Sequence, residues 1–471
     1  MNHKPSRTII FLAPLLVLMY LAPKVEEHFK SEDVVVKAEI PNWSELLEEE
    51  EDSVEIVEPL PIDTVIERID TLIINANRFN PSYATHNTST LPDSLKLKGS
   101  EIAFKGLYGF FEKLETIYES DSLPLEVFHW GDSQIEGDRI SGVLRSSWQK
   151  SWGGSGPGLI PAIQPIPSLS VRQEHSGNMI RYTRFGQIDS TLTHSAYGPM
   201  AAFCLVKGEG QTKVNTHPSG FKLNKIWPRV KFYISGAPLG GNITLTGKKT
   251  PYKAFNIRPA KSGNYQEIEA NLPECETSIS IGFEGYNLEV TGIELGSKTG
   301  VQIHNIPMRG SAGMLFTKLD ARHFQKSLNG RNIGLMILQF GGNVVPYIKD
   351  QASAERYTHR FSKQLDYLKS IVPDVAIIVI GPSDMGSIGF YPMLAEVVKS
   401  LEVAAIESNC LFWDLRSAMG GEGSMMVWSE AEPKLASPDL VHFTPKGARI
   451  VGEKFDMSIR AEYKSWVEWR H

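Results

Sequence analysis

The chain has 471 residues, of which 41% are hydrophobic and 22% are charged, and this predicts two or three globular domains with a sizeable core. The net charge of −6 and the lack of a basic stripe exclude nucleic acid as an expected partner. The three cysteines include no CxxC pair and no metal-ligand spacing, which excludes a disulfide framework. One bridge between Cys204 and Cys275 stays open, although we favour three separate buried thiols.

The amino terminus has the charge order of an export signal. Lys4 and Arg7 precede the apolar stretch 8–22, and acidic residues follow it. The stretch is shorter than the roughly 20 residues of a membrane span, but the sequence around Ala22 is a poor cleavage site. We therefore assign 1–23 as a signal peptide or an N-terminal membrane anchor, with the anchor slightly favoured. Either assignment predicts an exported protein of the periplasm or cell envelope, and the anchor predicts a tether to the inner membrane.

The next two segments lead into the main fold. Residues 24–60 are acidic and poor in core residues, and Glu48 to Asp52 is a run of like charge, so we expect a flexible tether. Residues 61–122 form an N-terminal segment in which 100–118 has apolar residues at helical spacing. We expect that helix to pack on the sheet that follows.

An alternation of strands and helices begins near Pro124. Residues 123–128 predict a buried strand, and after a short turn 140–148 has helical spacing. Further along the chain, the alternation continues with strands expected at 301–304, 333–340, 375–380 and 411–413, and helices at 313–328, 354–371, 393–407 and 445–469. This rhythm predicts a doubly wound parallel sheet built from 123–167 and 299–471.

Residues 168–298 interrupt that rhythm. Short alternating runs recur there, separated by turn signals, at 180–185, 230–235, 242–245, 278–283 and 288–295. This spacing predicts an inserted β-sandwich, jelly-roll-like, of the carbohydrate-binding kind. Its aromatic residues could form a sugar-stacking face, although core packing is the commoner role for any one of them.

Two motifs at opposite ends of the α/β part carry nucleophile chemistry. Ser133 lies in a Gly-Asp-Ser turn at the carboxyl end of the first strand, where an open sheet binds its ligands and a helix start favours negative charge. Asp439 and His442 are three residues apart in the loop before the last helix. At that spacing the carboxylate can hold the imidazole in one tautomer while the other ring nitrogen faces outward. Together they predict a nucleophile, a base and an orienting acid.

Two further residues follow strands of the same sheet and offer hydrogen-bond donors. Asn343 comes after the strand at 333–340, and Gly310 lies in a turn after 301–304. With the Ser133 N–H, they would form an oxyanion hole. A simple turn role is the alternative for each of them. The α/β-hydrolase fold is disfavoured because Ser133 lacks the Gly-x-Ser-x-Gly elbow.

In order, Gly131-Asp132-Ser133, the Gly310 turn, Gly341-Gly342-Asn343 and the Asp439–His442 pair resemble the sequence blocks of the SGNH (GDSL-type) hydrolase superfamily. The resemblance covers about 125–165 and 300–460. It implies a flavodoxin-like three-layer α/β/α sandwich. It also implies Ser133 as nucleophile, His442 as base and Asp439 as its partner. The oxyanion hole would use the Ser133 and Gly310 N–H groups and the Asn343 side chain, with no metal or cofactor.

The inserted β module makes the layout most similar to bacterial peptidoglycan O-acetylesterases. That resemblance implies a serine esterase that removes O-acetyl groups from a cell-envelope glycan or polysaccharide through an acyl-enzyme. One alternative is an O-acetyltransferase that works with a membrane-bound O-acyltransferase. The other is a non-catalytic glycan-binding envelope protein that uses 168–298. The expected partners are therefore an acetylated glycan and, through the amino terminus, a membrane.

Overall fold

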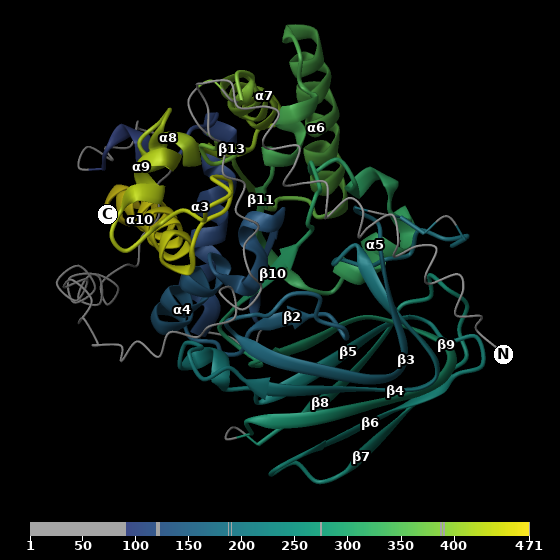
Figure 1. Ribbon diagram of the computed structural model, residues 1–471. Helices are drawn as coiled ribbons and strands as arrows, with labels where there is room; N and C mark the ends of the chain where they lie inside the picture. Colours follow the sequence, from purple (N-terminus) through teal and green to yellow (C-terminus); the bar gives the residue numbers. More distant parts are fainter. Residues whose placement is uncertain are drawn as a thin grey trace, which may run out of the picture. The chain divides into compact units, whose positions relative to one another are not determined.

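A five-stranded parallel sheet forms the middle of the structure, a computed structural model that describes residues 91–118, 123–186, 188–189, 191–273, 276–386, 389 and 391–470. Its strands are β1 (Leu125–Gly131), β10 (Val301–Pro307), β11 (Asn332–Gln339), β12 (Ala376–Ile380) and β13 (Leu411–Trp413). They lie in the order β10-β1-β11-β12-β13 (Figure 1). In chain order this reads 2-1-3-4-5, the flavodoxin-like arrangement. The predicted α/β/α sandwich is confirmed.

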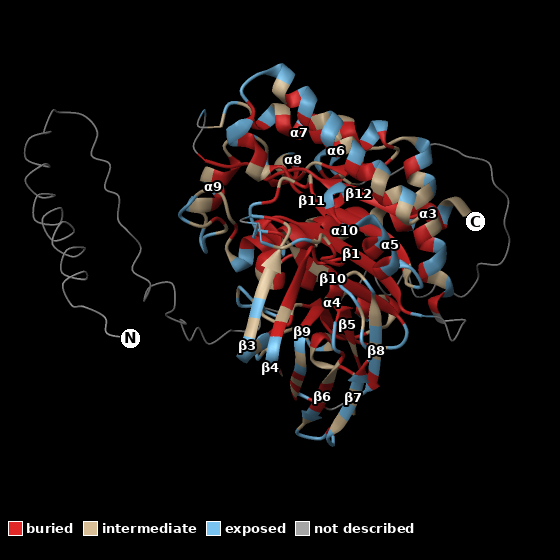
Figure 2. Cartoon of the chain, turned by 90° about the vertical axis from the view of Figure 1, so that its right-hand side faces the viewer, coloured by how far each residue is buried: buried red, intermediate tan, exposed pale blue. Residues whose placement is uncertain are grey.

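Helices cover both faces of this sheet, which explains its apolar strands. One face carries α3 (Glu101–Glu115), α4 (Ser141–Trp152) and α10 (Pro445–Arg470), and the other carries α5 (Ala321–Leu328), α6 (Gln351–Ile371) and α7 (Leu394–Glu407). A parallel strand buried on both faces needs an unbroken apolar run. The β12 strand, Ala-Ile-Ile-Val-Ile, is buried throughout. Figure 2 shows these strands in red inside the helices.

Most of the expected helices have nearly the expected bounds. The helix expected at 100–118 is α3, followed by a short 3-10 helix η3 (Thr116–Tyr118), and it packs on β11 and β12 as predicted. The helix expected at 313–328 is shorter. There, only α5 is α-helical and a 3-10 turn η6 (Phe316–Lys318) precedes it. Asp320 caps α5 by accepting a hydrogen bond from the His323 N–H at 2.7 Å, which fixes the late start. Two short helices, α8 (Leu415–Met419) and α9 (Ser424–Glu430), were not expected.

An antiparallel module interrupts the α/β part, as predicted. Its strands are β2 (Gly158–Ile160), β3 (Val171–Thr183), β4 (Ala202–Thr216), β5 (Arg229–Gly236), β6 (Gly241–Gly247), β7 (Lys253–Ile257), β8 (Gln266–Asn271) and β9 (Ser278–Gly296). Hydrogen bonds join all eight into one continuous sheet, whose strands enclose a common buried apolar cluster. The reason is β9, which runs unbroken where two strands were expected. It pairs with β4 and then β2 along one edge, and with β6 and then β5 along the other.

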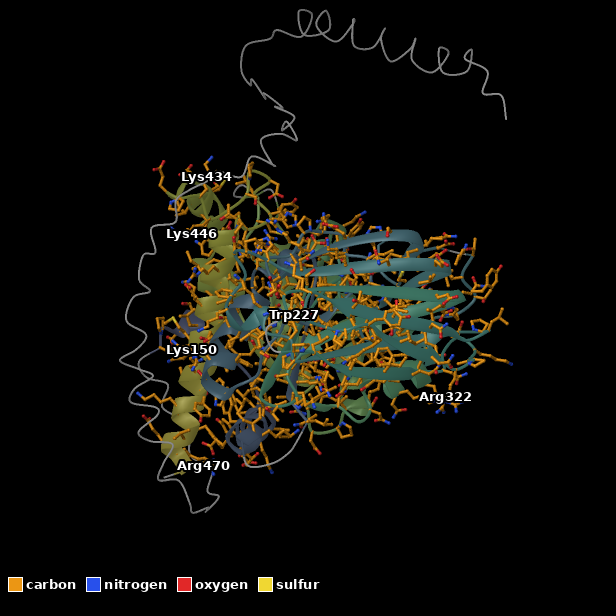
Figure 3. All side chains as sticks on the ribbon, turned by 90° about the horizontal axis from the view of Figure 1, so that it is seen from below. Lys150, Trp227, Arg322, Lys434, Lys446 and Arg470 are labelled. Carbon is orange, nitrogen blue, oxygen red and sulfur yellow. The ribbon has the colours of Figure 1, made fainter. Side chains whose placement is uncertain are left out.

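The module and the parallel sheet share one core. Phe128 and Trp130 of β1 belong to the same buried cluster as Phe203 of β4 and Tyr233 of β5. The Gly-rich loop before β2 also brings the two sheets together. A Cβ at Gly154, whose φ is +99°, would lie 2.4 Å from the carbonyl oxygen of Val301, so only glycine allows this approach. Figure 3 shows the antiparallel strands on one side and α10 on the other.

Two of the three cysteines are described, and both are buried free thiols, Cys204 and Cys410. Burial raises the pKa of each thiol to about 12, so neither is a thiolate at neutral pH. Cys275, the proposed partner of Cys204, lies outside the described residues. The predicted signal or anchor (1–23) and the acidic tether (24–60) also lie outside them. No helix in the described part of the chain has the length and apolar character needed to cross a bilayer.

Glu462, a buried carboxyl group on α10, gives a test of how this helix packs. Burial raises the pKa of Glu462 from its ordinary value of 4.5 to about 7. The folded protein therefore keeps this proton up to about pH 7, and the resulting stabilisation is lost as the pH rises from 4.5 through 7. At pH 8, Glu462→Gln is expected to raise the free energy of unfolding by up to about 3 kcal/mol, and with it the thermal midpoint. At pH 4.5 the substitution is expected to change the thermal midpoint little. The exposed Glu468→Gln on the same helix serves as control, and an equal gain at both pH values would contradict the expectation.

Candidate active site

The structure brings Ser133, His442 and Asp439 into one chain of hydrogen bonds. Ser133 directly follows β1 and Asp132, and it begins a 3-10 helix, η4 (Ser133–Asp138). Its Oγ lies 2.8 Å from Nε2 of His442. Nδ1 of His442 lies 2.7 Å from Oδ2 of Asp439. This is the order of contacts that a serine nucleophile, a base and an orienting acid require.

Asp439 is held ionised by its own loop. The backbone N–H groups of Val441 and His442 both donate to Oδ1 at 2.9 Å. Burial acts to raise the pKa of Asp439, but the hydrogen bonds from the His442 ring and these two N–H groups outweigh it and lower the pKa to about 2. At neutral pH the carboxylate therefore accepts a hydrogen bond from the N–H at Nδ1 of His442. This leaves Nε2 without a proton and able to accept the proton of Ser133.

Two side chains from the Ser133 segment hold the loop that carries His442. Gln134 donates from Nε2 to the carbonyl oxygen of Val441, and Arg139 donates from Nη1 to that of Phe443 at 2.8 Å. Both contacts flank His442, so they set the distance from its ring to Ser133. Sequence analysis gave these residues no role. Their only signal was their position directly after the Gly-Asp-Ser motif.

A buried acid lies beside the nucleophile. Asp132 is 4% exposed, and its Oδ1 accepts a hydrogen bond from the Gln134 N–H at 3.0 Å. Burial raises its pKa to about 6 against the opposing effects of that hydrogen bond and of His442. This carboxyl therefore changes charge close to neutral pH, next to Ser133.

A cavity of about 270 Å³ opens onto this chain of contacts and includes Ser133, Asn343 and His442 in its lining. Asn343 lies in the 3-10 helix η7 (Gly342–Tyr347) after β11, and its Nδ2 donates to the carbonyl oxygen of Ser311 at 3.2 Å. That bond ties it to the turn that holds Gly310. Gly310 itself is exposed, with a φ of +76°, and does not line the cavity. The structure thus places Asn343 beside Ser133 and leaves Gly310 in the adjoining turn.

Among the described residues, one buried cluster has the donor set of a metal site: Glu126, Glu294 and His304. Its carboxylates already have cationic partners, because Arg331 contacts Glu126 at 2.7 Å and Glu294 at 3.0 Å. Nδ1 of His304 accepts the Leu159 N–H at 3.0 Å. Its Nε2 therefore carries the proton and faces Glu126 as a donor. The cluster is better explained as an ion-pair network than as a set of free ligands.

No family model matches the chain, and no curated protein matches its sequence. Among solved structures, a peptidoglycan O-acetylesterase is similar over 78% of this chain and 99% of its own length, with a TM-score of 0.61 and 21% identity. The chain shares the fold of that esterase. An active-site mutant of a family two carbohydrate esterase from Clostridium thermocellum matches with 9% identity over 60% of this chain and 98% of its own, at a TM-score of 0.26. A carbohydrate acetylesterase from Sinorhizobium meliloti matches with 12% identity over 34% and 79%, also at 0.26.

Proposed function

We propose that the protein is an SGNH-type serine esterase that removes O-acetyl groups from a glycan. The observation that carries the proposal is the continuous contact from Ser133 Oγ through His442 to Asp439 at the wall of a cavity. The fold shared with a peptidoglycan O-acetylesterase supports it. The two alternatives, acetyl transfer and glycan binding without catalysis, have no observation of their own in their favour.

The contacts support the following acylation step. Oγ of Ser133 attacks the carbonyl carbon of the acetyl ester, and its proton moves to Nε2 of His442. Asp439, ionised beside Nδ1, stabilises the imidazolium that forms. The Ser133 N–H and the Asn343 side chain, both at the cavity, would donate to the oxyanion. The intermediate then collapses, the bond to the sugar oxygen breaks, and Nε2 returns its proton to that oxygen.

Deacylation follows the same path with water in place of the sugar. His442 removes a proton from a water molecule, which attacks the acetyl-serine carbonyl carbon. The bond to Oγ breaks, Ser133 regains its proton from Nε2, and acetate leaves. No step requires a metal or a redox cofactor.

The site of action is a further part of the proposal. The substrate would be an acetylated glycan or polysaccharide of the cell envelope. The protein would be exported to the periplasm or cell envelope and tethered to the inner membrane by 1–23. The basis for export is the charge order around the apolar stretch 8–22.

The proposal predicts that Ser133 is chemically activated. After treatment with a fluorophosphonate, intact-mass spectrometry of the full chain is expected to show one adduct, located on Ser133 by peptide mapping. Ser133→Ala is expected to remove the adduct, and His442→Gln to slow its formation, because the base no longer accepts the proton. A folded protein that forms no adduct, or forms it on another serine, would refute the proposed nucleophile.

A further inference from the structure

A second cavity, of about 230 Å³, is lined in part by residues 136–138, which follow Ser133 in the chain, and lies where the parallel sheet meets the antiparallel module. Two of its lining residues belong to the proposed active-site segments. Glu136 lies three residues after Ser133 on η4, and Arg309 is the neighbour of Gly310. The module supplies most of the remaining wall, which is largely apolar and includes Leu159, Ile166, Phe185 and Met200.

Arg181 of β3 lines this cavity, and its side chain has no hydrogen-bond partner among the residues that the structure describes. Its Nε is buried and makes no hydrogen bond to any residue that the structure describes. The guanidinium carbon lies 5.7 Å from the ring centroid of Phe185. Burial lowers the pKa of Arg181, and the carboxylate that acts against this shift is Glu136. Since arginine stays charged in proteins, the cavity wall holds a cation that a buried setting penalises unless an anion pairs with it.

The acidic residues in the wall do not balance that charge. Glu136 already accepts two hydrogen bonds from Arg309, one of them from Nε at 2.9 Å. Its charge also acts to raise the pKa of Arg139 and of Arg181, so three guanidinium groups share the field of one carboxylate.

The other acid in the wall, Asp138, is fully engaged elsewhere. It accepts hydrogen bonds from both terminal nitrogens of Arg145, at 2.5 Å and 3.1 Å, and from Ser170. The charged side chains of this cavity therefore carry an excess of positive charge, close in the chain to the proposed nucleophile.

We propose that this cavity binds a carboxylate of the glycan, carried by a sugar unit near the acetylated one, and that Arg181 pairs with it. The inference rests on the proposed function and names its substrate as an acidic glycan. The guanidinium fork matches a carboxylate through two parallel hydrogen bonds, and the Arg181 side chain lines the cavity. The apolar wall would pack against the faces of the sugar ring. The antiparallel module would then select the substrate by supplying Arg181.

The test measures binding without turnover. Full-length protein carrying Ser133→Ala is titrated by calorimetry with an O-acetylated oligogalacturonide and with the same oligosaccharide after its carboxylates are reduced to alcohols. The acidic probe is expected to bind about tenfold tighter or more, as a charge-assisted pair requires. Adding Arg181→Gln is expected to abolish the difference and leave the affinity for the neutral probe unchanged. The exposed Arg258→Gln, a charge-matched control, is expected to preserve the difference.

Equal binding of the two probes would overturn the inference. So would tighter binding of a sulfated oligosaccharide of the same length, because the site would then prefer another anion. Arg181→Lys, which keeps the charge and loses the fork, is expected to restore part of the affinity, and it keeps the test decisive if the glutamine variant does not fold. Absence of an adduct on Ser133 would defeat the esterase proposal alone, whereas an adduct together with equal binding would defeat the carboxylate site alone.

Discussion

Ser133→Ala is expected to lower the kcat for hydrolysis of a small acetyl ester by about 10⁴-fold or more. The side chain does two things that alanine cannot do. Its Oγ would form the acyl-enzyme, and its proton is the one that His442 would accept across 2.8 Å. The fold should survive, because His442 is the one hydrogen-bond partner of Oγ among the described residues and Ser133 follows a fully buried strand, β1.

The measurement is the steady-state rate of acetate release from 4-nitrophenyl acetate and from an O-acetylated oligosaccharide, with thermal denaturation as the check of folding. Ser370→Ala is the matched control. That serine is exposed near the end of α6, where its Oγ donates to the Tyr367 carbonyl oxygen at 2.7 Å, so kcat should not change. A Ser133→Ala protein with the wild-type rate on both substrates would rule out the acyl-enzyme mechanism.

The parallel sheet could be predicted because its strands are short, apolar and each followed by a helix. The β12 and β13 strands have nearly the expected bounds for this reason. Two motifs 309 residues apart could also be linked, since both lie at the carboxyl edge of such a sheet. Topology alone therefore predicts the contact from Ser133 to His442.

The antiparallel module shows where periodicity fails. Its β4 strand was not expected, because glycines and charges occupy the exposed middle of a long strand, Ala202–Thr216, whose apolar residues lie mainly at one end. Likewise, β9 continues through Gly285 and Asn287, residues that usually indicate a turn. Pairing with β4 continues on both sides of this point, and Asn287, with a φ of +57°, is the extra residue of a bulge between Tyr286 and Leu288. Such tertiary pairing leaves no local pattern in the sequence.

The hydrogen bonds that position the His442 loop were equally hard to predict from the sequence. Gln134 and Arg139 act on carbonyl oxygens of the His442 loop, and any residue offers a carbonyl oxygen. No residue type on the receiving side could therefore have signalled these contacts. Gly310 illustrates the opposite case. The residue type was suggestive, but the structure leaves it exposed in the turn beside the cavity.

The largest effect on stability is expected from Glu294, a buried carboxylate of β9 that joins the module to the parallel sheet. It lies 2.7 Å from Nη2 of Arg229 and 3.0 Å from Nη1 of Arg331, and it accepts the Tyr233 hydroxyl at 2.6 Å. Arg331 in turn contacts Glu126 of β1, the strand that leads to Ser133. Burial would raise the pKa of Glu294, but Arg331, Arg229 and the hydrogen bond from Tyr233 together hold it far below its ordinary range.

Glu294→Ala leaves two buried guanidinium groups with one carboxylate less, which cannot be relieved by deprotonation of arginine. The expected cost is about 3–5 kcal/mol of unfolding free energy, the typical result of removing one partner from a buried ion pair. Urea denaturation followed by tryptophan fluorescence measures it. Glu284→Ala, an exposed position on the same strand, should stay within about 0.5 kcal/mol of the wild type. If Glu294→Ala were as mild as that control, the network would contribute little, and the shared apolar core around Phe128 and Tyr233 would have to hold the two sheets together by itself.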